Sequence, residues 1–208
     1  MTPDCIEKKV AYLQAHSKIR MVRSDGMYYN PNTLKYQNIA KSEDKSQQDN
    51  FEKLLLVKTY FCSGCYMISR SLFLECYPDK DIFESRVGQN WQLLVPAASR
   101  SICGYIDESL YIVNEHSDSH SRHKRTTAEM YQRWDMFTDV LRHAVDVSRC
   151  DEKQAYRLIE ENRAREQFYY AVSCCDKSML MSTMAEIKKF GHPTMKEWLL
   201  YLKCLVGG

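Results

Sequence analysis

A change in hydrophobic periodicity near residue 125 constrains the fold of this chain more than any other feature. Beyond that point large apolar side chains recur every three or four residues, as on one face of an amphipathic α-helix. The clearest run comprises Met130, Trp134, Phe137, Leu141 and Val145. Before that point, short apolar runs alternate with turn-forming residues. The sequence therefore predicts an α/β region over residues 1–124 and an all-helical C-terminal extension over residues 125–208.

Capping signals delimit the helices of the extension. Asp151 with Gln154, and Thr194 with Glu197, have the spacing of capping boxes. Gly191 precedes the second of these pairs and is typical of a helix end. We therefore expect helices at about 151–174, 177–190 and 194–205, joined by short turns and packed on each other or on the preceding domain.

The first region reads as an alternation of helices and short strands. Thr2 followed by Pro3 is typical of a helix start, and this helix is expected to end near residue 16. Asp25-Gly26 is a turn signal at the end of a short strand. The remaining expectations are a strand at 19–24, a polar excursion at 28–50 with a strand edge at 34–36, a helix at 51–57, a buried strand at 65–68, a helical turn at 70–75, a loop at 78–83, a helix at 89–98, strands at 102–106 and 110–113, and a loop at 116–124.

Composition excludes several classes of protein. The net charge of +2 gives no basis for nucleic-acid binding, which needs a clustered basic face. No apolar run approaches the ~20 residues that span a bilayer, and the N-terminus carries acids and has no apolar core, so it is not a signal peptide. Nine cysteines without framework spacing indicate reduced thiols, and hence a cytoplasmic protein.

Several short motifs follow one another between residues 61 and 122, and their order is more informative than any one of them. They are Cys62-Ser63-Gly64, Arg70, Gly88-Gln89-Asn90-Trp91, Asp107-Glu108-Ser109-Leu110-Tyr111, and the segment from His116 to Arg122. This order resembles the second, acceptor-side half of a family 2 glycosyltransferase with the A-type, Rossmann-like fold. The resemblance extends back to residue 1, whereas the helical extension resembles nothing that we can name.

The resemblance implies an incomplete A-type glycosyltransferase domain, because the half that binds the nucleotide would be missing. The intact enzyme would take a sugar from a nucleotide-diphosphate sugar and transfer it to a glycan or lipid-linked acceptor. A divalent metal, Mg or Mn, would be held by an Asp-x-Asp motif of the missing half. We therefore expect the isolated chain to be inactive and to self-associate through an exposed sheet edge. A cytoplasmic location is implied, with a peripheral position at the inner membrane face as an option.

The resemblance also assigns roles to individual residues. Asn90 occupies the position of the catalytic base and Gln89 its neighbour, where the family carries acids. An amide cannot accept a proton, so a nearby carboxylate, Glu84 or Asp81, would have to substitute. The implied diphosphate contacts are His116, Ser119, Ser121 and Arg122, and the implied acceptor-side residues are Ser63, Gly64 and Trp91.

Other interpretations of the same residues stay open. Gln89 and Asn90 could simply cap a helix, or the amides could mark a non-catalytic interaction module. Cys62 and Cys65 form a CxxC pair, but the second cysteine is expected to begin a strand, which favours packing over redox or zinc chemistry.

Two further motifs have simple surface interpretations. Three histidines, at 116, 120 and 123, could bind zinc if the segment were helical, but interleaved serines favour a loop. Asp79-Lys80-Asp81 imitates a metal motif but does not end an apolar strand, so a charged surface loop is the favoured interpretation.

Overall fold

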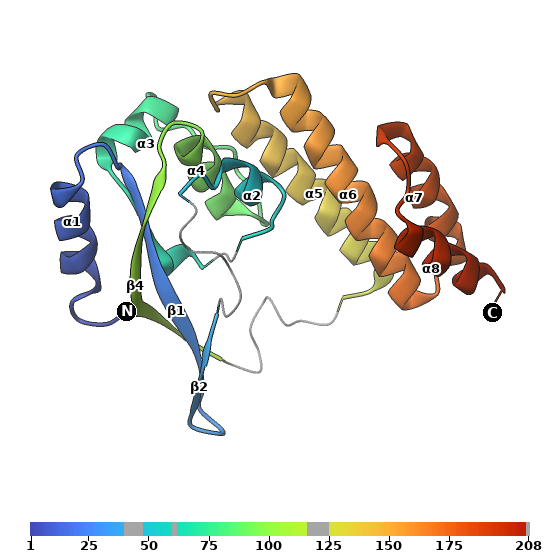
Figure 1. The fold of residues 1–208 in the computed structure, drawn as a ribbon, viewed down its shortest axis with the longest axis horizontal. Coiled ribbons are helices and arrows are strands. Elements are labelled where there is room, and N and C mark those ends of the chain that lie inside the picture. The colour runs from blue at the N-terminus through green and yellow to red at the C-terminus, as the bar shows by residue number, and fades with distance from the viewer. Residues whose placement is uncertain (40–47, 60–61, 116–124, 207–208) are drawn as a thin grey trace.

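The computed structural model describes residues 1–39, 48–59, 62–115 and 125–206, and shows a mixed α/β protein with a helical C-terminal part (Figure 1). In chain order its elements are α1 (Cys5–Ala15), β1 (Met21–Asn30), β2 (Lys35–Asn38), α2 (Phe51–Leu55), the 3₁₀ turn η1 (Ser63–Cys65), β3 (Tyr66–Ile68), α3 (Arg70–Cys76), α4 (Gln89–Ala98), β4 (Cys103–Asn114), α5 (Thr127–Asp146), α6 (Glu152–Cys174), α7 (Lys177–Phe190) and α8 (Met195–Val206). The expected α/β class is confirmed at this level, while the architecture does not identify an A-type glycosyltransferase domain.

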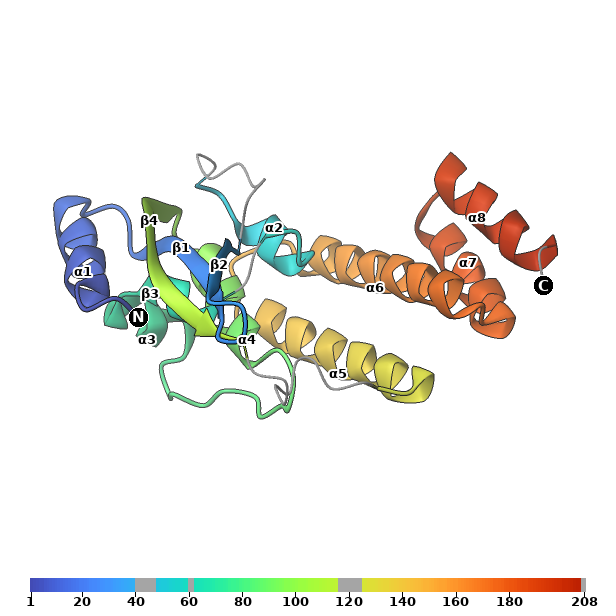
Figure 2. The same cartoon turned by 90° about the horizontal axis from the view of Figure 1, so that it is seen from below.

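Strand β1 is the centre of a mixed sheet. Along one side it pairs in parallel with β4 over most of its length. Along the other side β3 pairs antiparallel with residues 21–23, and β2 pairs antiparallel with residues 27–30. Two short strands therefore share one edge of β1, and α1 lies on the opposite side of the sheet from α2 and α4 (Figures 1 and 2).

Strands β1 and β4 are both longer than the sequence predicts. The expected turn at Asp25-Gly26 is wrong, because β1 continues through it. The two short strands expected around Asp107-Glu108 are one strand, β4. The register explains both errors: Ser24 pairs with Ile106 but Asp25 pairs with Ser109, so residues 107 and 108 bulge out of the ladder.

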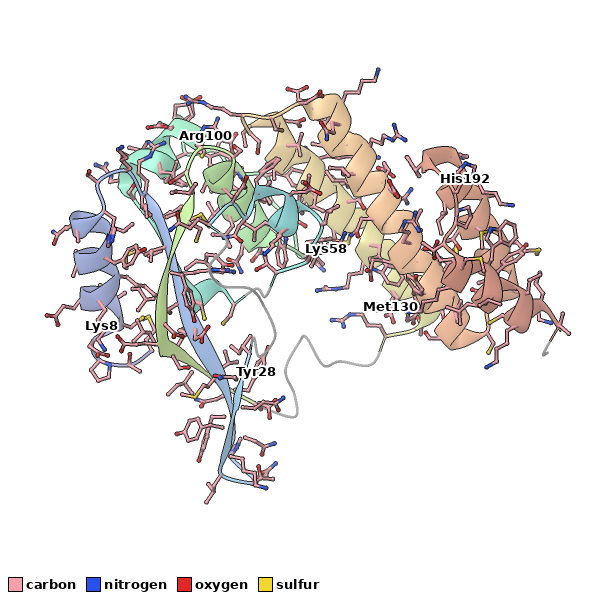
Figure 3. All side chains as sticks on the ribbon, viewed as in Figure 1. Lys8, Tyr28, Lys58, Arg100, Met130 and His192 are labelled. Carbon is pink, nitrogen blue, oxygen red and sulfur yellow. The ribbon has the colours of Figure 1, made fainter. Side chains whose placement is uncertain are left out.

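Helix α1 begins two residues later than its sequence signals indicate. Its N-cap is Asp4, without a side-chain capping bond. The Thr2 amide instead donates to the Leu110 carbonyl at 3.0 Å, which joins the N-terminus to β4. Lys8 of α1, labelled in Figure 3, pairs with Asp4 and with Glu108 of the bulge, so the bulge also secures the helix against the sheet.

Two hydrophobic cores follow one another along the molecule. The first contains residues of β1, β4 and α2–α4 together with Leu141, Val145 and Ile159. The second is formed by the last part of α6 with α7 and α8, and includes Phe168 and Ile187. The division at residues 124/125 stays a prediction, and the packing of the first core continues across it.

The expected helix starts of the extension are confirmed in detail. The Asp151 carboxylate accepts a hydrogen bond from the backbone amide of Gln154 at 3.0 Å. The Thr194 backbone amide donates to the Glu197 carboxylate at 2.6 Å, and the Glu197 backbone amide donates to the Thr194 hydroxyl at 3.2 Å, as a capping box requires. A further capping box, Thr126 with Glu129, begins α5 and is not among the predicted pairs. Within the described ranges, no helix is long and apolar enough to cross a bilayer.

Candidate functional site

A cavity of about 760 Å³ lies between the loop at residues 82–86, the start of α4 and the middle of α5. It brings together three of the residues singled out from the sequence: Glu84, Gln89 and Asn90. Its walls are Ile82, Phe83, Glu84, Ser85, Arg86, Gln89, Asn90, Gln92, Leu93, Met136 and Asp139. The site thus combines segments that are separated by about fifty residues in the sequence.

Two glutamine side chains of α4 hold the loop that forms one wall of this cavity. The Gln89 side-chain amide donates to the Ser85 carbonyl at 2.7 Å. The Gln92 amide, which is buried, donates to the Phe83 carbonyl at 2.5 Å. Positions three apart share one helix face, so both bonds are made from the same side of α4. Sequence reasoning missed Gln92, although its spacing from Gln89 was the available signal.

Gly88, not an amide side chain, occupies the N-cap of α4. Its φ of 63° lies in the left-handed region, and no side chain of the described residues caps this helix. A Cβ at this position would lie 2.6 Å from the Phe137 ring, so the close approach of α5 also requires glycine. The interpretation of Gln89 and Asn90 as helix caps is therefore wrong: Gln89 holds the loop, and Asn90 is the second residue of the helix.

Asn90 lies between the main cavity and a smaller one of about 100 Å³ that is lined by Tyr66, Ile68 and Leu94. Its side chain is half-buried, and no residue of the described ranges forms a hydrogen bond with it. An amide offers two donors and a carbonyl acceptor. Asn90 can therefore bind a ligand group that both donates and accepts a hydrogen bond.

Carboxylates of the loop at residues 82–86 and of α5 lie around the cavity. Glu84 is exposed on its wall, and Asp139 faces it from α5, where Arg142 lies 3.4 Å from the Asp139 carboxylate. Asp81, the other carboxylate considered as a substitute base, lines a neighbouring cavity of about 470 Å³. Only Glu84 of this pair shares a cavity with Asn90.

The predicted acceptor-side residues lie away from this cavity. The Trp91 indole donates to the Leu54 carbonyl at 3.0 Å and packs edge-on against Phe137, with ring centroids 5.1 Å apart. Ser63 and Gly64 lie in η1, beside the sheet. Trp91 therefore joins α4 to α2 and α5, and the three residues do not form one surface with Asn90.

The predicted diphosphate contacts His116, Ser119, Ser121 and Arg122 lie outside the described residues, as do the other histidines of that segment. Asp79 and Asp81 are exposed, in agreement with a surface loop. Among the described residues, no group of three or more His, Cys, Asp or Glu side chains could hold a metal ion. The expectation of Mg or Mn in the intact enzyme stays a prediction.

No protein-family model matches this chain, and neither does any curated protein or solved structure.

Proposed function

We propose that this chain is the acceptor-side part of a glycosyltransferase domain, and that the cavity beside α4 binds a hydroxyl-bearing sugar acceptor. The observation that carries the proposal is the Asn90 amide, which faces the cavity without a hydrogen-bond partner among the described residues. Amides with nearby carboxylates suit sugars, because a hydroxyl group both donates and accepts. The predicted order of motifs supports the same assignment, since the helix at 89–98 begins directly after its N-cap Gly88, as the resemblance implies.

The geometry suggests distinct roles for three residues. Asn90 would orient the attacking hydroxyl, because its amide can bond to that group but cannot remove its proton. Glu84 would accept the proton, as the carboxylate on the same cavity wall. Gln89 would position the loop that carries Glu84, since its own amide is already bonded to Ser85.

The donor side of the reaction rests on the resemblance alone. A nucleotide-diphosphate sugar would supply the sugar, and a divalent metal would stabilise the departing diphosphate. The isolated chain should then bind a saccharide without turning over a donor. Release of nucleotide diphosphate by the purified chain would contradict this part of the proposal.

Saccharide binding is the direct test. Saturation-transfer NMR with a panel of mono- and disaccharides should detect binding to the chain. Asn90→Ala should weaken binding about fivefold to tenfold, the effect of one lost hydrogen bond, and Glu84→Gln should retain binding. Asn32→Ala, on the exposed turn after β1, is the matched control for the first change, and Glu7→Gln on α1 for the second. Absence of any saccharide signal, or equal binding by Asn90→Ala and Asn32→Ala, would reject the proposal.

A non-catalytic interaction module is the second candidate. It is favoured by the structural use of Gln89 and by the exposed apolar side chains of α8, Leu199 and Leu202 among them. The double change Gln89→Glu with Asn90→Asp, measured in an enzyme that includes a donor-binding half, separates the two. If the unmodified enzyme is inactive and the double change makes it active, the chain is a module that has lost catalysis. If the unmodified enzyme is already active, the glycosyltransferase proposal is supported.

A further inference from the structure

Cys62 and Cys65 lie in one tight turn on the sheet, away from the sugar cavity. The Cys65 amide donates to the Cys62 carbonyl at 2.9 Å, which closes the turn. The two thiol groups interact, and each shifts the pKa of the other. Strand β3 begins only at Tyr66, so the expectation that Cys65 begins a strand is wrong. Both thiols belong to the same turn.

The exposure of the two thiols differs. Cys62 is half-buried and therefore open to a reagent, whereas Cys65 is fully buried. An accessible cysteine next to a protected one is the arrangement in which the first is attacked from solvent and the second completes an intramolecular bond.

A buried lysine lies against the same turn. Lys9 of α1 is only 1% exposed, and its ammonium group donates to the Gly64 carbonyl at 2.8 Å. Gly64 directly precedes Cys65 in this turn. It cannot carry a side chain, because a Cβ there would lie 1.9 Å from the Tyr111 ring. The turn is thus held between α1 and β4, with a positive charge fixed beside the sulfurs.

We propose that Cys62 and Cys65 form a redox-active dithiol site that exchanges with a disulfide substrate, either a small molecule such as glutathione disulfide or a protein disulfide. The proposal does not depend on sugar binding. It assigns attack to Cys62, ring closure to Cys65, and charge stabilisation to Lys9.

The exchange balances in two steps. The Cys62 thiolate attacks one sulfur of the external disulfide, forms a mixed disulfide and releases the first substrate thiolate. Cys65 then gives its proton to the released substrate thiolate, and the Cys65 thiolate attacks the Cys62 sulfur. The second substrate thiolate leaves, and an intramolecular disulfide remains. The protein loses two electrons and two protons, and the external disulfide becomes two thiols.

The electrostatics of the turn agree with these roles. The hydrogen bond from Cys65, the amides of Gly64 and Cys65, and the charge of Lys9 lower the pKa of Cys62 to about 7. The hydrogen bond to Cys62 and burial raise the pKa of Cys65, and the nearby Asp25 carboxylate acts in the same direction. Once Cys62 is bonded to a substrate sulfur, its negative charge no longer opposes ionisation of Cys65.

One tryptic peptide provides a direct readout. Residues 59–70 follow Lys58, end at Arg70 and contain no cysteine besides Cys62 and Cys65. After equilibration in glutathione buffers, acid quenching and alkylation of the denatured protein, mass spectrometry should find this peptide lighter by two hydrogen atoms and without alkyl groups under oxidising conditions. Dithiothreitol should restore two alkylated thiols. A peptide that carries two alkyl groups in every buffer would overturn the proposal.

Single substitutions test the order of the steps. Cys65→Ser should trap a glutathione adduct on Cys62, whereas Cys62→Ser should leave Cys65 unmodified because it is buried. Cys174→Ser, at the exposed end of α6, is the control and should change neither result. An adduct on Cys65 at the wild-type rate in Cys62→Ser would contradict the assigned order.

The pH dependence of alkylation tests Lys9. In the wild type, the alkylation rate of Cys62 should have its midpoint at about pH 7. Lys9→Gln should raise the midpoint, and Cys65→Ala should raise it further toward about 8.5, the value of a free thiol, because the hydrogen bond from Cys65 lowers this pKa more than the charge of Lys9 does. Lys18→Gln, at an exposed position just after the same helix, should leave it unchanged. If Lys9→Gln does not fold, the wild-type midpoint alone decides, and a value near 8.5 would reject the role of the turn.

Discussion

The two cores of this protein differ in what they bury. The first includes or adjoins buried polar and charged side chains, among them Lys9, Arg23 and Asp25, and it supports both candidate sites. The second is formed from helices alone, and its buried charge is Glu197, which pairs with Arg165. Irregular segments and buried polar groups thus accompany the two candidate sites in the first region, whereas the second shows the regular pattern of a helical packing unit.

Helix α6 belongs to both cores. Ala155 and Ile159 in its first half pack in the first core, while Phe168 and Ala171 in its second half pack in the second. It runs antiparallel to α5, and Trp134 packs edge-on against Tyr170, with ring centroids 5.0 Å apart (Figures 1 and 2). The change in composition at residue 125 therefore precedes the change of core by more than thirty residues.

The largest effect is expected from the centre of the second core. Phe168 is fully buried. Phe168→Ala should lower the free energy of unfolding by about 3–5 kcal/mol, because it leaves a cavity. Denaturant unfolding followed by Trp198 fluorescence on α8 should report this loss. If the cores are independent, Trp91 in the first region will unfold at its original midpoint, and a shared shift of both probes would show that α6 couples them.

A smaller effect is expected where the first region meets α5. Gly88→Ala should cost about 2 kcal/mol, because alanine resists a left-handed backbone and its methyl group would contact Phe137. In a Phe137→Leu background the cost should fall if the contact contributes. An unchanged cost in that background would assign the whole effect to the backbone. Thermal unfolding of the four variants completes this double-mutant cycle.

The ion pair of the second core should make its stability depend on pH. Burial raises the pKa of Glu197, but hydrogen bonds with Arg165 and Thr194 outweigh it and hold the pKa below the usual 4.5. The stabilisation is therefore present above about pH 4.5 and is lost as the pH falls through the lower value of the folded state. Glu197→Gln should cost about 2 kcal/mol at pH 7 and less at pH 3. Urea unfolding at both pH values measures this, and an equal cost at both would contradict the pairing.

The smallest effect is expected at the start of α5. Thr126 and Glu129 form a reciprocal capping box, with the Thr126 amide 2.7 Å from the Glu129 carboxylate. Thr126→Ala should cost about 1 kcal/mol. Thr126→Ser should be close to neutral and serves as the control. Calorimetry of the two variants measures the difference, and equal losses would show that the hydroxyl group is not the stabilising element.

Local signals predicted the helices well and the sheet less well. Helix α4 has the predicted bounds, and the capping pairs at Asp151 and Thr194 begin helices as expected. Helical periodicity and capping bonds depend on residues three or four positions apart, so a sequence shows them directly. The sequence predicts two strands in place of β4, because residues 107 and 108 are polar and interrupt the alternation of apolar and polar side chains. Their bulge is defined by pairing with β1, which is distant in sequence.

The candidate sites were predictable only in part. The sequence identified Asn90 and Glu84, and the cavity brings them together. It did not identify the loop-holding role of Gln89 and Gln92, because their three-residue spacing indicates a shared helix face but not which loop carbonyls that face meets. It also gave no reason to connect Lys9 with the cysteine turn, since α1 reaches that turn only through the packing of the sheet.

The length of α6 has a geometric consequence. Its 23 residues extend over about 35 Å of continuous helix, with successive residues rotated by about 100°. Inserting one residue between Ile159 and Ala164 would keep the face for the first core in place and turn the face for α7 and α8 by that angle about the helix axis. The number of residues between the two faces thus sets the azimuth of the terminal helices, so insertions and deletions here should be tolerated only in multiples close to a full turn.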